Sequence, residues 1–361
     1  MGRYDIAVLP GDGIGIEVTQ AALTVLQALA PRLGRTFHTT VHPAGAGHYR
    51  DHGVALPDAT LRACRRADAI LFGAMGLPDV RGADGTEIIP QLDLRFALDL
   101  YAGVRPIRTW PGLPVPLADP RAAQIDLVLV RESTEGLFHA RGRGRVEGDG
   151  EAQAAYDTMC ISRAGTSRVC DFALRLARRR KAAGRPGVVT NVDKANVFTS
   201  MAFWRQIFEE RARGFPDVGH ESLYVDAMAL NLVMRPWQFD VLVTENMFGD
   251  ILSDLMAALV GGMGMAPSAD IGDAHALFQP AHGTAPDIAG KGVANPSAML
   301  LSLAMMLDWL GERHADAALC DGADRISAAL QRAFVGGQVL PRDFGGRSNT
   351  ADVVAAVLAG L

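Results

Sequence analysis

Two acidic side chains spaced four residues apart give the clearest indication of chemistry in this sequence. Asp250 and Asp254 lie in a segment with helical spacing, Met247 to Leu259. Residues four apart share one face of a helix, where like charges repel, so the pair does not stabilise the helix. A hard cation such as Mg²⁺ or Mn²⁺ would relieve that repulsion, because both prefer carboxylate oxygens. The spacing favours a metal site, and an exposed acidic helix face is the alternative.

Asp226 and Lys194 are two further candidates for a metal site and for proton transfer beside it. Asp226 comes just after an expected strand, where an acid serves either as a metal ligand or as a helix cap. Lys194 follows the short apolar run Val188 to Thr190. A lysine beside a metal is suited to proton transfer, and a solvated lysine is the alternative.

Arg95, Arg105 and Arg131 stand at or near the ends of expected elements and supply positive charge. The planar guanidinium group can bind a carboxylate through two hydrogen bonds. The three arginines are therefore candidates for binding an acidic small molecule, with surface ion pairs as the alternative.

Two glycine-containing segments are candidates for a nucleotide site. The first runs from Pro10 through Ile14 to Gly15, between an expected strand and helix, but position 16 is Ile, so it fits a Rossmann fingerprint poorly. The second runs His282-Gly283-Thr284-Ala285-Pro286-Asp287. Asp287 could accept hydrogen bonds from a ribose diol and would repel a 2′-phosphate, which favours NAD over NADP. A plain turn and a loop histidine are the alternatives.

Short apolar runs alternate with helical segments, which predicts an α/β protein. Bounded runs of this kind suit strands covered on both faces. The expected strands are Asp5–Leu9, Ala69–Phe72, Leu127–Val130, Val188–Thr190 and Val241–Thr244, and the clearest helical segments are Glu17–Leu29, Arg163–Arg179 and Met247–Leu259.

Composition narrows the classes of function. The formal net charge is −5, so no global basic field would attract nucleic acid. The longest uncharged stretch, between Lys291 and Asp308, is too short to span a bilayer. The N-terminus has no signal-peptide pattern, and the four cysteines form no CxxC pair. We expect a cytoplasmic protein with reduced thiols and neither a nucleic-acid nor a membrane partner.

Taken in order, these segments resemble the isocitrate/isopropylmalate dehydrogenase family, the β-decarboxylating dehydrogenases. The resemblance covers nearly the whole chain. It rests on Gly11–Gly15, Leu98–Tyr101 through Arg105-Pro106, Arg131–Gly136, Val192–Asn196, Thr244–Asp250 and His282–Gly290.

The resemblance implies two α/β domains around a cleft, in an isopropylmalate dehydrogenase-like fold that is not a Rossmann fold. Residues 1–100 plus 261–361 would form a discontinuous cofactor-side domain. Residues 101–260 would form the domain for dimerisation, metal and substrate, with an inter-subunit arm at about 137–160. An obligate homodimer is implied, in which Lys194 and Asp226 enter the site of the neighbouring subunit.

The resemblance also implies an oxidoreductase mechanism. Arg95, Arg105 and Arg131 would bind the carboxylates of a 2-hydroxy dicarboxylic acid. Asp226, Asp250 and Asp254 would hold Mg²⁺ or Mn²⁺, and Lys194 with Asp226 would assist removal of the hydroxyl proton as hydride passes to NAD. The ketone, polarised by the metal, would then lose CO₂. The adenosine half of NAD would contact Ile14, the loop His282, Gly283, Thr284, Ala285 and Asp287, and Asn295.

One departure concerns the decarboxylation step. Most of the family has a tyrosine where this chain has Phe138, and that tyrosine is thought to protonate the enol. Phe138 has no hydroxyl group. Three hypotheses follow: His139 or a water donates the proton, the reaction stops at oxidation or decarboxylates slowly, or the alignment slips locally.

A second departure concerns the substrate. Residues between Thr86 and Arg95 should contact its variable group, and here they read Glu87-Ile88-Ile89-Pro90-Gln91-Leu92. A third carboxylate buried against these apolar side chains would be costly. We therefore expect 3-isopropylmalate first, with tartrate or D-malate next, since Arg131–Gly136 looks more like the tartrate and isocitrate branches. Isocitrate, homoisocitrate, a non-catalytic relative and a metal-dependent lyase rank lower.

Overall fold

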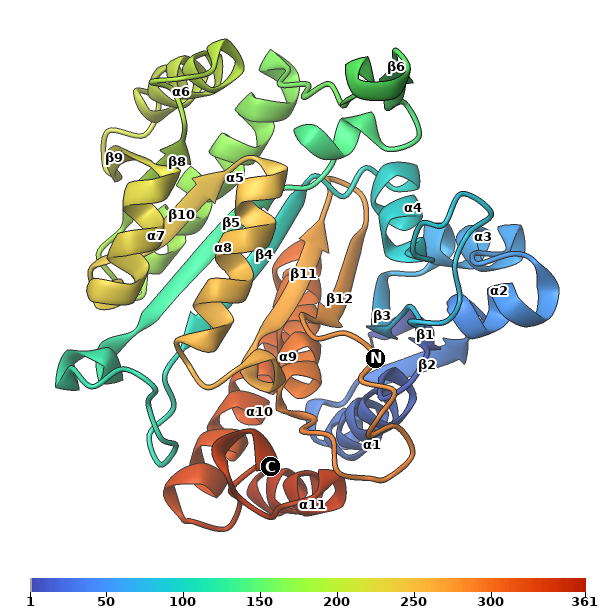
Figure 1. The fold of residues 1–361 in the computed structure, drawn as a ribbon. Coiled ribbons are helices and arrows are strands. Elements are labelled where there is room, and N and C mark those ends of the chain that lie inside the picture. The colour runs from blue at the N-terminus through green and yellow to red at the C-terminus, as the bar shows by residue number, and fades with distance from the viewer. Residues whose placement is uncertain (1) are drawn as a thin grey trace. The chain divides into compact units, whose positions relative to one another are not determined.

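The computed structural model describes residues 2–361, which form two compact α/β units (Figure 1). Among the described residues, unit 1 comprises 2–100, 109–118 and 257–361, and unit 2 comprises 101–108 and 119–256. The expected α/β class is confirmed. Segment 109–118 lies in unit 1, whereas the sequence-based division placed it in the middle domain. Its Trp110 packs edge-on against Phe334, with ring centroids 5.8 Å apart.

Unit 1 contains a sheet with the strand order β2-β1-β3-β12-β11. β11 runs antiparallel to β12 and the other pairs are parallel, which differs from an all-parallel Rossmann sheet. Every residue of β3 is buried, as expected for a strand covered on both faces. The strands are β1 (Arg3–Gly11), β2 (Thr36–Val41), β3 (Ala69–Ala74), β11 (Pro267–Ile271) and β12 (Ala276–Pro280).

Seven helices accompany this sheet among the described residues of unit 1. They are α1 (Gly15–Leu33), α2 (Ala46–His52), α3 (Asp58–Arg66), α4 (Pro90–Ala97), α9 (Ser297–His314), α10 (Ala317–Val335) and α11 (Thr350–Gly360). The expected helix Glu17–Leu29 is the central part of α1, which the left-handed Gly34 (φ 61°) ends.

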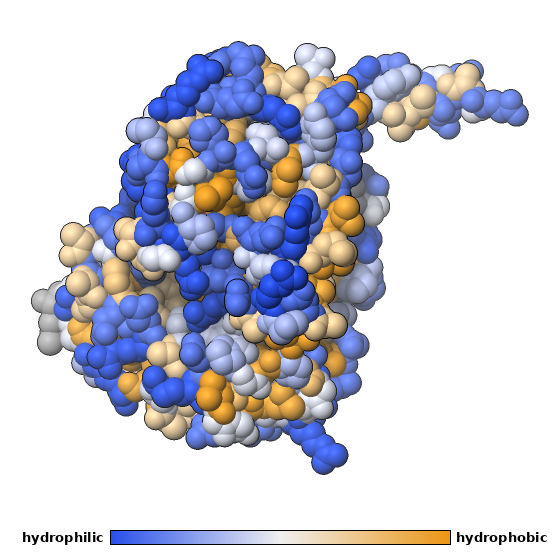
Figure 2. Space-filling view, turned by 90° about the vertical axis from the view of Figure 1, so that its left-hand side faces the viewer, coloured by the Kyte–Doolittle hydropathy of each residue, from blue (hydrophilic) through white to orange (hydrophobic). Residues whose placement is uncertain are grey.

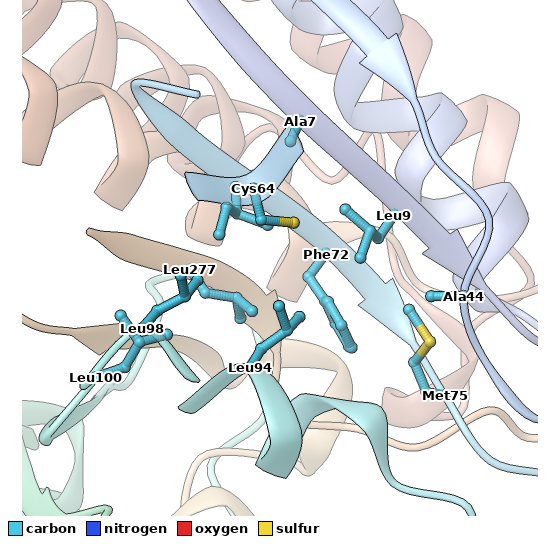
Figure 3. Close-up of a cluster of buried hydrophobic side chains, with 11 residues drawn as sticks. Ala7, Leu9, Ala44, Cys64, Phe72, Met75, Leu94, Leu98, Leu100 and Leu277 are labelled. Carbon is cyan, nitrogen blue, oxygen red and sulfur yellow. The ribbon is translucent and has the colours of Figure 1, made fainter. Parts of the chain in front are cut away.

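A buried apolar cluster holds α4 in unit 1 (Figure 3). Phe72 from β3 lies between Leu9 of β1 and Leu94 of α4, with Met75 beside it. Leu94 and Leu98 are four residues apart, so they present one apolar face to this cluster. The cluster thereby fixes the helix that carries Arg95.

Unit 2 contains the strand order β4-β5-β10-β8-β9, in which β4 is antiparallel to β5 and the other pairs are parallel. The strands are β4 (Ala102–Arg108), β5 (Asp126–Glu132), β8 (Val188–Asp193), β9 (Gly219–Tyr224) and β10 (Val241–Thr244). The helices are α5 (Arg163–Ala182), α6 (Thr199–Ala212), α7 (Val225–Met234) and α8 (Asn246–Ala258).

A two-stranded arm also belongs to unit 2. Strands β6 (Arg145–Glu147) and β7 (Ala154–Tyr156) pair antiparallel, and a bridge between Gly136 and Cys160 closes the base of the arm. Figure 2 shows the arm projecting near the top, with hydrophilic and hydrophobic side chains mixed along it. Its Val146 and Tyr156 are 63% and 45% exposed.

The cysteines are free thiols, and Cys64 and Cys170 are buried. Burial raises the pKa of Cys64 to about 12, so this thiol is unreactive in the folded protein. Among residues 2–361, no helix has the length and apolar character needed to cross a membrane.

The cluster around Phe72 generates a stability prediction. Phe72→Ala removes a fully buried ring and should lower the free energy of unfolding by about 3–5 kcal/mol, measured by chemical denaturation. Phe96→Ala on α4 is the matched control, because Phe96 is 42% exposed, and it should cost less than about 1 kcal/mol. Equal losses for the two variants would contradict the assignment of the core.

Candidate active site

A buried arginine organises the polar face of unit 2. Arg131 on β5 is 3% exposed and donates from Nε and Nη2 to the side-chain oxygen of Asn246, at 2.8 and 2.6 Å. Its Nη1 contacts Asp250, and its guanidinium carbon lies 5.0 Å from the centroid of the Phe138 ring. These contacts hold the guanidinium group in one orientation, which is what recognition of a carboxylate requires.

Arg105 lies on the same sheet face as Arg131. Arg105 on β4 pairs with Leu129 of β5, and Arg131 is two residues further along that strand. Side chains two apart in a strand share a face, so the two arginines are diagonal neighbours. Both are buried, which excludes the alternative of surface ion pairs.

Asp250 and Asp254 lie four residues apart on α8 and so share one helix face, as the sequence predicted, and Asp250 contacts Arg131. Burial raises the pKa of Asp254, the charge of Asp250 raises it further, and the charges of Arg131 and Arg105 partly offset these effects. The repulsion that a cation would relieve is therefore present, and carboxylate oxygens are suitable ligands for Mg²⁺ or Mn²⁺.

Gly249 makes room for Arg131. A Cβ atom added at this glycine would lie 2.7 Å from both Cβ and Cγ of Arg131. These atoms are the base of the side chain, so they cannot swing away as the tip of a flexible chain could. The motif needs glycine here because the arginine packs directly against α8.

Three glutamates in the motifs have structural roles. Glu132 accepts from the Thr134 N–H and hydroxyl and from the Glu135 N–H, which closes a turn after β5. Glu135 accepts from Ser162, and Glu245 accepts from the N–H groups of Met247 and Phe248 at the start of α8. Burial raises the pKa values of Glu132 and Glu245, with the hydrogen bonds acting in the opposite direction.

Lys194 and Asp226 pair with each other in unit 2. Lys194 Nζ lies 2.5 Å from Asp226 Oδ1, and this hydrogen bond lowers the pKa of Asp226. Asp226 is in the first turn of α7, and its side chain is 67% exposed. The loop that carries Lys194 is held by Asp193, which is buried and accepts from Arg205 at 2.8 and 2.7 Å.

Asp226 does not join the acids of α8 within one chain. Among residues 2–361, no three His, Cys, Asp or Glu side chains come close enough to hold a metal ion together. Within one chain the predicted set of three carboxylates is therefore not brought together.

Arg95 is buried on α4 in unit 1. Its Nε donates to Asp270 Oδ2 at 2.9 Å, and Asp270 also accepts from Gln279 at 3.0 Å. Seven residues before Arg95 in the sequence, Ile88 packs in a core cluster with Ala46 and Val80. Part of the segment expected to face the substrate is therefore committed to the core of unit 1.

The two glycine-containing segments meet in unit 1. The Ile14 N–H donates to the Thr284 carbonyl at 2.8 Å, and a Cβ atom on Gly13 (φ 55°) would lie 2.1 Å from that oxygen. Ala285 has a positive φ of 37°, a strained conformation of the kind that occurs at ligand sites. Asp287 is exposed at the end of this loop.

His282 and Asn295 are the remaining residues expected to contact the cofactor. His282 Nδ1 lies 2.9 Å from the Gly283 carbonyl, and its Nε2 is buried with no hydrogen-bond partner among residues 2–361. Asn295 is buried and donates to Asp343 at 2.9 Å.

Sequence reasoning assigned no role to Asn246, Gly249 or Asp343. Asn246 and Gly249 lie in the motif that ends at Asp250, so their spacing was visible, but their function depends on how α8 packs against β5. Asp343 lies 56 residues from Asp287 along the chain, and no local pattern links it to the cofactor loop.

Unit 2 thus places carboxylates beside buried arginines, and unit 1 places a glycine turn beside a strained loop. This combination agrees with a hydroxy-acid dehydrogenase. The chain belongs to the isocitrate/isopropylmalate dehydrogenase family, whose pattern it matches over residues 5–357. It is an enzyme of the oxidoreductase class.

Individual relatives cover almost the whole chain. The 3-isopropylmalate dehydrogenase of Moorella thermoacetica is 45% identical over 94% of this chain and 92% of its own. The 3-isopropylmalate/3-methylmalate dehydrogenase of Methanocaldococcus jannaschii is 40% identical over 98% of both chains. The crystal structure of isocitrate dehydrogenase from Methylococcus capsulatus has a TM-score of 0.86 and 36% identity, and covers 99% of both chains.

The packing of Gly249 generates a prediction about substrate binding. Gly249→Ala should displace Arg131 and raise the KM for the hydroxy acid at least about tenfold, with the KM for the cofactor unchanged, measured by steady-state kinetics. Gly214→Ala in the same unit is the control, because its new Cβ atom would meet only the Arg211 carbonyl at 3.3 Å. A wild-type KM in Gly249→Ala would show that Arg131 does not bind the substrate.

Proposed function

We propose that this chain is an NAD-dependent and Mg²⁺- or Mn²⁺-dependent dehydrogenase that oxidises and decarboxylates a malate-type 2-hydroxy dicarboxylic acid. The first candidate substrate is 3-isopropylmalate, as the names of the relatives suggest. The observation that carries the proposal is the arrangement of Arg105 and Arg131 on one sheet face, opposite Asp250 and Asp254.

The roles of the chain's own residues follow from their chemistry. Arg95, Arg105 and Arg131 bind the substrate carboxylates, because fixed guanidinium groups match that geometry. Lys194 and Asp226 assist removal of the proton from the 2-hydroxyl group. A cation held by Asp250, Asp254 and Asp226 of the partner subunit would polarise the oxygen of the reacting carbon, and NAD would accept the hydride.

The exposed Asp287 supports NAD over NADP. A carboxylate at the ribose repels a 2′-phosphate and can accept hydrogen bonds from a diol. Ile14, Gly283, Thr284 and Ala285 shape the same region through backbone contacts. We therefore assign the adenosine half of the cofactor to this loop of unit 1.

A second candidate substrate is tartrate, and Gln91 is the observation that favours it. Gln91 is four residues before Arg95 on α4, so the two share a helix face. Its side-chain oxygen is buried and has no hydrogen-bond partner among residues 2–361. A hydroxyl group beside the bound carboxylate would satisfy that oxygen, whereas an isopropyl group would not.

A substrate panel tests the proposed reaction. NADH formation should be fastest with 3-isopropylmalate, and chelation should abolish it until Mn²⁺ or Mg²⁺ is restored. Tartrate and D-malate complete the panel, which is run with NAD and with NADP. Preference for NADP, or full activity after chelation, would contradict the proposal.

The same assay decides the effect of Phe138. CO₂ released per NADH should be about one if the reaction is completed without the family tyrosine. His139 is the nearest alternative donor in sequence, and its Nε2 lies 2.7 Å from Arg143 Nη1. A ratio well below one would show that the reaction stops at oxidation.

We further propose that the active form is a homodimer that forms through unit 2. Leu230, Val233 and Met234 occupy one face of α7 and are 65%, 46% and 64% exposed. Val197 and Phe198, beside the Lys194 loop, are also exposed, at 59% and 52%. A second copy would cover these apolar side chains and bring its Lys194 and Asp226 to the acids of α8.

Subunit complementation tests this sharing of residues. Lys194→Met and Asp254→Asn should each be inactive alone, because each loses an essential group. Equal amounts, mixed and reassembled, should recover about a quarter of wild-type activity, because half of the dimers carry one intact site of two. Asp250→Asn mixed with Asp254→Asn is the control and should recover nothing. No recovery in the first mixture would show that each site uses one chain only.

A further inference from the structure

Two histidines on helix α2 lie side by side, apart from the residues of the candidate active site. His48 and His52 are four residues apart, so they share one face of the helix. Their ring centroids lie 4.4 Å apart, with the ring planes inclined at 45°. His52 is exposed and His48 is partly exposed, so solvent reaches both rings. The helix thus brings two imidazole groups together at the surface of unit 1.

The separation of the two rings matches that of two ligands on one cation. With metal–nitrogen bonds of about 2.1 Å, two imidazole groups at right angles around a cation have ring centres about 4.5 Å apart. Right angles between neighbouring ligands occur in octahedral and square-planar complexes, which Ni²⁺ and Cu²⁺ form. The torsion that turns an imidazole ring is soft, so an exposed ring can direct a nitrogen toward its neighbour at small cost.

The backbone of α2 is held at both ends. Asp12 accepts from the N–H groups of Ala46 and Gly47 at 2.7 and 2.8 Å. Gly53 (φ 74°) ends the helix, and its N–H donates to the Tyr49 carbonyl at 2.7 Å. Tyr49 also packs against the core cluster that contains Ala46. Because the helix is already ordered, a cation that joins the two histidines pays little for ordering the backbone.

The residues around the pair allow a cation but supply no further ligand. Arg50 and Asp51 lie between the histidines in sequence and pair with each other at 2.9 Å, so the charge of Arg50 is balanced. Within residues 2–361, no third His, Cys, Asp or Glu completes a metal cluster. The residue after His48 is Tyr49, whereas a zinc-peptidase motif has a glutamate there. The geometry therefore suits a cation with two protein ligands and water at its other positions.

We propose that His48 and His52 chelate a transition-metal cation of the class that prefers imidazole, such as Ni²⁺, Cu²⁺ or Zn²⁺. Imidazole nitrogen is a softer ligand than carboxylate oxygen, so this site disfavours Mg²⁺ and Mn²⁺, which suit the acids of α8. Once one ring has bound the cation, the second is held beside it at a high effective concentration. Chelation by the pair is therefore much tighter than binding by one histidine.

Titration calorimetry with NiCl₂ tests the site on the purified full chain without an affinity tag. Excess MgCl₂ is present, so that carboxylates do not take up Ni²⁺. We expect one Ni²⁺ per chain, bound in the micromolar range. His48→Gln and His52→Gln should each weaken this binding by at least about tenfold, and the double variant should be little weaker, because either change removes the chelate. His38→Gln is the matched control and should bind as the wild type does, since His38 is a single histidine on β2 with a 61% exposed side chain.

Hydrogen exchange gives a second, local readout. A cation that joins residues one turn apart stabilises α2, so Ni²⁺ should slow amide exchange in residues 46–53 of the wild type. The double variant should show no slowing with Ni²⁺, and the wild type should show none with Mg²⁺ alone. Slowing that persists in the double variant would place the cation elsewhere and overturn the proposal.

The calorimetric outcomes separate chelation from its alternatives. Two Ni²⁺ per chain in the wild type, with one lost at unchanged affinity in each single variant, would show two independent histidines. Wild-type protein that binds no Ni²⁺, or a double variant that binds it equally well, would overturn the site. None of these measurements uses NAD or a hydroxy acid, so failure here is distinguishable from failure of the proposed function.

Discussion

The burial of the Arg131 guanidinium group is the constraint on which the rest of unit 2 depends. An isolated buried charge is costly, so each of its N–H groups needs an acceptor. Asn246 supplies a neutral acceptor for two of them, and Asp250 contacts a third. The first turn of α8 must therefore lie against β5, and Gly249 is the residue that permits this approach.

The acids of the same motifs divide into two groups by their partners. Glu132, Glu135 and Glu245 accept from backbone N–H groups and fix turns. Asp250 and Asp254 have exposed side chains and repel each other on one helix face. The exposed carboxylates of these motifs are therefore those of the second group. The glutamates hold the loop after β5 and the start of α8, and α8 carries the aspartates. Structural residues and candidate site residues therefore alternate within these motifs.

The sequence predicted the parts of this protein that depend on local pattern. The strand Val241–Thr244 and the start of α5 at Arg163 agree with the structure because apolar runs and helical spacing are local signals. Strand β9 was expected before Asp226, but its bounds were not predicted, since its Gly-His-Glu-Ser start is polar and exposed at a sheet edge. The helix-face pairing of Asp250 and Asp254 was predictable from a spacing of four. The contacts Arg131–Asn246 and Asn295–Asp343 were not, because each joins residues that only the folded chain brings together.

The pairing of Lys194 with Asp226 bears on how a complete site would form. In the single chain the two side chains neutralise each other, and the hydrogen bond from Lys194 lowers the pKa of Asp226, so the carboxylate stays ionised. An ionised carboxylate is the form that a divalent cation binds. Lys194 stays hydrogen-bonded to Asp226 on this exposed helix turn. In the proposed homodimer, the same contact would keep a proton carrier beside the carboxylate. An exposed ion pair contributes little to stability, so this pair holds the two groups together at little cost in free energy. In the proposed homodimer, the second subunit would supply the acids that these two groups meet.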